Sequence, residues 1–176
     1  MVADQISKEK TGKTILNEAD KYALIEGWQP TDANEVTEFN RYNKAWRTAC
    51  FAELDAQTIY LQAKVKYQAM LIEKYQDKEG HATKETFLVL RTDFIKNYEL
   101  LLGFQSFFKR LSKTYNMDLL YRVDLLITEC KKMTESFNKD FPTELQIDME
   151  KIKPNGERAE PAVKELSELL GDDFNE

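Results

Sequence analysis

The chain has 176 residues, of which 42% are hydrophobic and 32% charged, and its net charge is −6. These values are typical of one globular domain with appendages, and the acidic balance argues against a broadly cationic surface that would coat nucleic acid. Only six glycines and four prolines occur. That is too few for the many turns of an all-β fold, so the expected fold class is all-α.

The N-terminal residues, the lengths of the apolar runs and the two cysteines indicate the cellular compartment. Residues 1–5 carry neither the charged region nor the apolar run of a signal peptide. No apolar run approaches the ~20 residues of a membrane span. Cys50 and Cys130 lie far apart within helical patterns, which argues against a disulfide framework and favours buried thiols. We therefore expect a cytoplasmic protein (in the host cytoplasm if a phage encodes it) with no membrane partner.

Residues 1–16 are polar and basic, and they are expected to form a flexible arm. A mobile arm can bind phosphate without shape demands, so any nucleic-acid contact is expected at its lysines, Lys8, Lys10 and Lys13. A helical bundle is expected over residues 17–141. It begins with a short helix from Asn17 to Gly27.

A long helix is expected to begin at Thr31 or Asp32, because no Gly or Pro then follows until Gly80. About 45 helical residues would extend about 70 Å. Small residues recur on it and would let another helix approach closely: Ala45, Ala49, Ala52, Ala56 and Ala63. Other residues widen its apolar surface beyond what one neighbour covers: Val36, Phe39, Trp46, Cys50, Leu54, Leu61, Val65 and Ile72. Either two helices of this chain or other subunits are expected to cover that surface.

Two further helices complete the expected bundle. A third helix carries an apolar stripe from Phe87 to Tyr115, and Gly103 within it is expected to mark a close contact or a bend. A fourth helix begins near Asp118 and ends before Pro142. Folding the third helix back along the long one predicts an elongated antiparallel, coiled-coil-like hairpin of two long helices, with the fourth helix on one side.

Residues 142–160 are expected to form a strand and a turn that link the bundle to the tail. Residues 144–150 alternate polar and apolar side chains strictly, which is the period of a half-buried strand. The sequence offers no convincing second strand, and an unpaired strand invites a partner from another chain. Partner contacts are therefore expected at its apolar residues, Leu145, Ile147 and Met149.

Residues 161–176 are expected to form an acidic amphipathic helix and tail, with Pro161 in the first turn and Gly171 as the stop. Residues 157–176 hold seven acidic and two basic side chains, a net charge of −5. The apolar side either lies in a partner's groove or folds back onto the chain's own body; we expect partner contacts at Val163, Leu166, Leu169, Leu170 and Phe174.

No catalytic, metal or cofactor site is expected. His81 is the only histidine, and it lacks the HExxH or ExxH partners of a metal site and an adjacent nucleophile. Glu53 and Asp55 stand two residues apart on a helix and should point to different faces. They are interpreted as solvated surface charge.

The sequence therefore predicts a non-enzymatic, homo-oligomeric assembly or adaptor protein that recruits a protein partner through residues 143–176. Its order of elements resembles that of the small terminase subunits of tailed phages: an N-terminal arm, a long helical hairpin, a C-terminal strand and a tail. The resemblance implies a role in DNA packaging, although no helix-turn-helix precedes the hairpin here. The alternative is a monomeric binding module, such as an immunity or inhibitor protein, whose acidic tail blocks a basic site.

Overall fold

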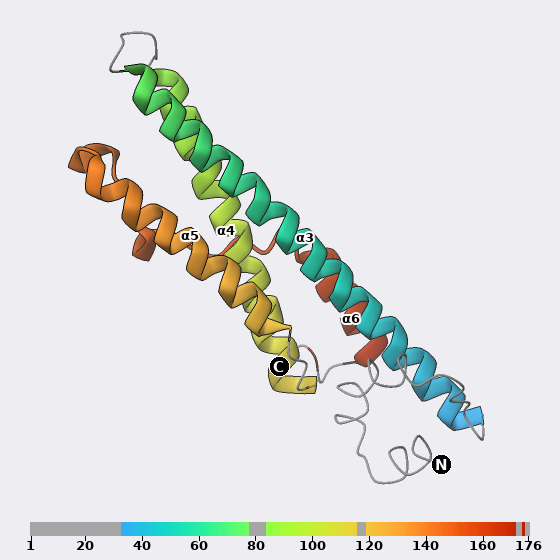
Figure 1. Cartoon of the computed structure of the whole chain (residues 1–176). Coiled ribbons are helices and arrows are strands. Elements are labelled where there is room, and N and C mark those ends of the chain that lie inside the picture. The colour runs from blue at the N-terminus through green and yellow to red at the C-terminus, as the bar shows by residue number, and fades with distance from the viewer. Residues whose placement is uncertain (1–32, 78–83, 116–118, 172–173, 175–176) are drawn as a thin grey trace.

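The computed structural model describes residues 33–77, 84–115, 119–171 and 174. Every element in this part of the chain is helical (Figure 1). In order they are α3 (Ala33–Asp77), α4 (Lys84–Tyr115), α5 (Leu120–Asp140), the 3-10 turns η1 (Thr143–Leu145) and η2 (Met149–Lys151), and α6 (Glu160–Leu170). The all-α prediction is confirmed for these residues. The expected arm over 1–16 and helix over 17–27 lie outside them.

The two longest helices form the expected antiparallel hairpin. α3 runs unbroken for 45 residues and α4 for 32, and they lie side by side along most of their length (Figure 1). A helix as long as α3 extends about 68 Å. The alanines predicted to allow close approach are all buried, including Ala49, Ala56 and Ala63. The small residues of α3 share one buried core with larger residues of α4, among them Phe94, Phe108 and Leu111.

α5 and α6 lie against different sides of α3. Arg122 at the start of α5 pairs with Glu53, with 3.2 Å between Nη1 and Oε2, and the Lys74 Nζ lies 3.3 Å from Asp140 Oδ2 near the end of α5. α5 therefore runs parallel to α3. Just before α6, Arg158 contacts Asp55. Because Glu53 and Asp55 are two residues apart on α3, their partners lie on different sides of the helix.

The predicted strand over residues 144–150 is not present. Residues 143–145 and 149–151 form 3-10 turns, and Ile147 between them is 2% exposed. The backbone at Gln146 is extended, and its N–H donates to Thr143 O. The other groups of this stretch bond to side chains of the helices: Asn138 of α5 bonds both backbone groups of Ile147, and Arg91 of α4 donates to Leu145 O and Gln146 O. Side chains can satisfy extended backbone where no strand is available.

Candidate functional site

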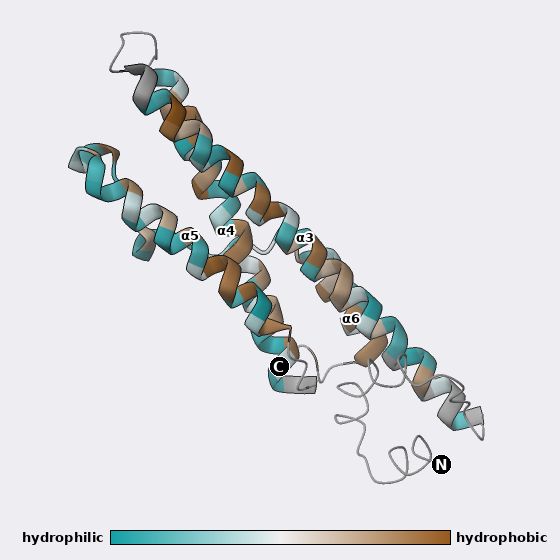
Figure 2. Cartoon of the chain, viewed as in Figure 1, coloured by the Kyte–Doolittle hydropathy of each residue, from teal (hydrophilic) through white to brown (hydrophobic). Residues whose placement is uncertain are grey.

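The most unusual surface of the described chain is an apolar line along α3, which we call the outer stripe. Its members recur at alternating steps of three and four residues: Phe51, Leu54, Thr58, Leu61, Val65, Gln68 and Ile72. Five of them are large apolar side chains between 56% and 70% exposed. Figure 2 shows apolar residues recurring along the length of α3. Such spacing is the heptad pattern of a coiled-coil seam.

The outer stripe is not the face that packs in the hairpin. The buried residues of α3 follow a second heptad line, which holds Ala45, Ala49, Ala52, Ala56, Ile59, Ala63 and Met70. At 100° per residue the two lines lie on nearly opposite sides of the helix. α5 closes one flank through Glu53 and α6 closes the other through Asp55. The outer stripe is thus the side of α3 left open by the rest of the described chain.

The composition around the outer stripe differs from that of an ordinary solvated helix. Ten side chains of residues 51–72 are exposed, and only Lys64 among them is charged. On α5 eleven side chains are exposed, and seven of those are charged. Depletion of charge with large apolar side chains exposed is typical of a protein interface. Next to Phe51, a cavity of about 330 Å³ opens between α3 and α6.

The C-terminal residues predicted to bind a partner are placed against the chain's own body. Ile147, Leu166, Leu170 and Phe174 are buried, and the others pack partly buried against the same core: Leu145, Met149, Val163 and Leu169. The ring of Phe174 lies 6.0 Å from that of Phe107 and under the Arg110 guanidinium. The structure therefore has the fold-back arrangement, and partner binding by these side chains stays a prediction. Lys8, Lys10 and Lys13 lie outside the described residues.

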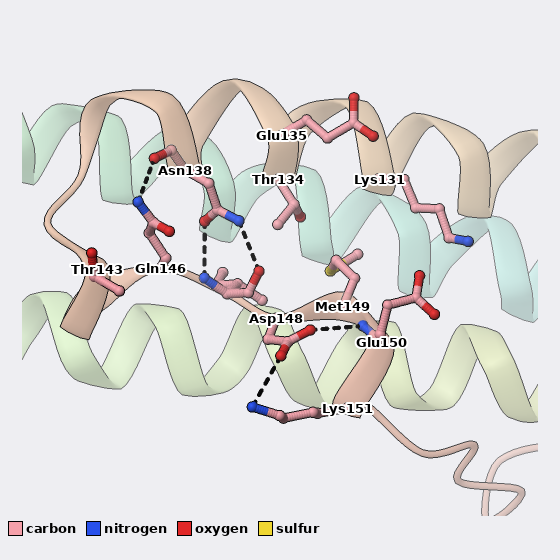
Figure 3. Close-up of a pocket in the computed structure, with 11 residues that line it drawn as sticks. Lys131, Thr134, Glu135, Asn138, Thr143, Gln146, Asp148, Met149, Glu150 and Lys151 are labelled. Carbon is pink, nitrogen blue, oxygen red and sulfur yellow. Dashed lines mark hydrogen bonds and ion pairs between the residues drawn. The ribbon is translucent and has the colours of Figure 1, made fainter.

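A polar cavity of about 600 Å³ lies between α5 and residues 143–151 (Figure 3). Asn138, Gln146 and Asp148 in its lining are engaged within the chain. Asn138 Nδ2 donates to Ile147 O at 2.8 Å, and Asn138 Oδ1 accepts from Ile147 N at 2.9 Å. Asp148 accepts from Glu150 N and pairs with Lys151, and Gln146 donates to two backbone carbonyls at the end of α5. These bonds tie residues 146–151 to the end of α5 and form one wall of the cavity.

Replacing Asn138 with Ala is expected to lower the free energy of unfolding by about 1–2 kcal/mol, because the backbone of the buried Ile147 loses both partners. Urea unfolding measures this loss, and protease cleavage within residues 142–152 should become faster. Ser136→Ala, an exposed change on the same helix, is the matched control and should leave both readouts unchanged. Equal behaviour of the two variants would show that Asn138 does not hold the segment.

The interpretation of Glu53 as solvated charge is wrong. Its side chain is only 6% exposed, accepts a hydrogen bond from Gln57 and pairs with Arg122. The carboxylate joins α3 to α5, and burial of a charge requires such partners. The second carboxylate, Asp55, points to the other side of α3 as expected.

Among the described residues, nucleophilic, acidic and metal-binding side chains do not gather at one site. No group of three His, Cys, Asp or Glu side chains there could hold a metal ion. Burial raises the pKa of the Cys130 thiol to about 12, so it stays protonated near neutral pH and is a poor nucleophile. Within the described ranges, no helix combines the length and the apolar character needed to cross a membrane.

Comparison with known proteins gives no relative: no protein-family model, curated protein or solved structure matches the chain significantly. The functional proposal therefore rests on the outer stripe of α3. Sequence reasoning noted Leu54, Leu61, Val65 and Ile72 as excess apolar surface but did not separate them from the buried line. Grouping the residues of α3 by heptad position would have separated the exposed apolar face from the buried face.

Proposed function

We propose that this chain is a non-enzymatic assembly protein that works by binding other helices along the outer stripe of α3. The observation that carries the proposal is the exposed heptad line with one charge among ten exposed side chains. We expect other subunits to cover the excess apolar surface of α3. This observation limits the expected contact to one face of the helix.

The energetics favour association over exposure. Burying a large aliphatic side chain contributes roughly 1.5–3 kcal/mol. The outer stripe offers five large apolar side chains, each more than half exposed. Association costs about 4–15 kcal/mol in lost freedom. Five side chains on each of two surfaces are therefore of the right size to offset that cost.

A more specific form of this proposal is a role in phage DNA packaging. The resemblance behind it consists of an N-terminal arm, a hairpin, a C-terminal strand and a tail; the described residues contain the hairpin and the tail helix without the strand. The alternative, a monomeric inhibitor, would use its acidic tail, whose apolar residues pack inward. A monomeric inhibitor leaves the outer stripe unexplained, so the assembly role is preferred.

The test is the mass in solution, by light scattering over a range of concentrations. We expect the unmodified chain to run at a multiple of 20.6 kDa and the double variant Leu54→Glu, Leu61→Glu to run as a monomer. Both side chains are exposed in the single chain, so the variant should keep its helix content and unfolding midpoint.

The matched control is Tyr121→Glu, Leu125→Glu. These are also exposed apolar residues of a long helix, but they lie on α5, away from the outer stripe. The control should keep the mass of the unmodified chain. A monomeric unmodified chain at high concentration would refute the assembly proposal.

A further inference from the structure

We infer that the occupant of the outer stripe is a second copy of this chain, with the two α3 helices parallel and in register. This inference rests on the proposed function and names its partner. In heptad notation, Phe51, Thr58, Val65 and Ile72 stand at position a and Leu54, Leu61 and Gln68 at position d. Three of the four a residues are thus β-branched, and two of the three d residues are Leu. β-Branched side chains at a with Leu at d favour parallel two-stranded coiled coils.

One polar layer fixes the register. In a parallel dimer Gln68 faces the partner's Gln68, and the two amides can share a hydrogen bond; the Thr58 hydroxyl already donates to Leu54 O at 3.0 Å within its own helix. A shift by one heptad would place Gln68 of the partner subunit against Leu61 and leave its amide in an apolar layer. Unmatched polar groups at a seam are costly, which is how such layers select one alignment.

From Gln57 to Ala69 the flanks of the seam accept a parallel partner without opposing charges of like sign; Asp55, the e position before them, is paired with Arg158 of its own chain. Positions g and e of facing helices come together across the seam, so Gln57 faces the partner's Gln62 and Lys64 faces the partner's Ala69. The antiparallel alignment that pairs Leu61 with the partner's Val65 instead sets Lys64 across from the partner's Lys64. Like charges at such a position oppose pairing.

The dimensions fit a second copy of α3. From Phe51 to Ile72 the outer stripe extends about 32 Å. The ten exposed side chains of residues 51–72 together expose on the order of 1,000 Å² per chain, which is the upper limit of the area that a partner could cover. A standard stable interface buries about 800 Å² per partner.

Disulfide trapping tests the inference in the full chain. Leu54→Cys in a Cys50→Ser background places a thiol at a d position, where a parallel in-register dimer brings the two copies within disulfide reach. Tyr121→Cys in the same background is the control, because that side chain is equally exposed but lies on α5. We expect Leu54→Cys to form a covalent dimer at least tenfold faster than Tyr121→Cys under mild oxidation at micromolar concentration.

The outcomes separate this inference from the proposed function. If the mass in solution is a multiple of the chain but Leu54→Cys does not trap, the parallel arrangement is overturned and the assembly role stands. In that case a Leu54→Cys chain mixed with a Val65→Cys or Ile72→Cys chain should trap instead, which identifies antiparallel pairing. If the unmodified chain is a monomer, the inference and the assembly proposal both fail.

Discussion

Replacing Phe137 with Ala is expected to lower the free energy of unfolding by about 4 kcal/mol, the range for truncating a buried aromatic side chain. Phe137 is 1% exposed at the end of α5. Its ring centroid lies 3.9 Å from that of Phe141, 5.8 Å from that of Phe87 and 6.4 Å from that of Tyr67. The side chain thus joins α5 to both helices of the hairpin, and Ala would leave a cavity that three rigid rings cannot easily fill.

Urea unfolding followed by circular dichroism measures this effect. The control is Tyr121→Ala, which removes an aromatic ring of α5 that is 62% exposed; we expect it to change the free energy of unfolding by less than about 0.5 kcal/mol. A loss below about 1 kcal/mol for Phe137→Ala would mean that the end of α5 is not packed on the hairpin as described. Loss of the unfolding cooperativity alone would instead indicate that α5 separates before the hairpin.

The hairpin could be predicted from sequence because its signals are local and agree with one another. α3 lacks Gly and Pro over its length, and α4 carries an apolar stripe with a helical period. The buried members Phe87, Phe94 and Tyr98 were all in the predicted stripe. Element type is most readable where periodicity is long and uninterrupted.

The C-terminal segment could not be predicted in the same way, because its backbone is satisfied by side chains of other elements. Arg91 lies 54 residues before Leu145, and Asn138 is on another element. An alternating pattern indicates that every second side chain is buried, but it does not indicate which groups form hydrogen bonds with the backbone. The same reasoning applies to Glu53, whose partner Arg122 is 69 residues away.

Replacing Gly103 with Ala is expected to lower the free energy of unfolding by about 2–3 kcal/mol and to release α6. A Cβ atom there would overlap Asn155 O and lie 2.9 Å from the Cα atom of Gly156. Both are backbone atoms, and Asn155 N also donates to Glu99 O at 2.9 Å, so the segment cannot rotate aside as a side chain would. The prediction that Gly103 marks a close contact is confirmed.

Two opposing terms decide the sign of this effect. Ala is favoured over Gly inside a helix by about 1 kcal/mol, whereas forced overpacking costs about 1–3 kcal/mol and more when backbone must move. The displaced segment also carries α6, with Leu166 and Leu170 in the core. Loss of their burial adds to the cost, so the packing terms exceed the propensity gain.

Hydrogen exchange distinguishes this outcome from a uniform loss of stability. In Gly103→Ala the amides of α6 should exchange faster while those in the middle of α3 and α4 keep more of their protection. Gly156→Ala is the matched control, because its Cβ would meet nothing within 4 Å, and it should leave protection unchanged. If Gly103→Ala were instead more stable and α6 equally protected, helix propensity would be the only effect, and the 152–156 segment would not lie against α4.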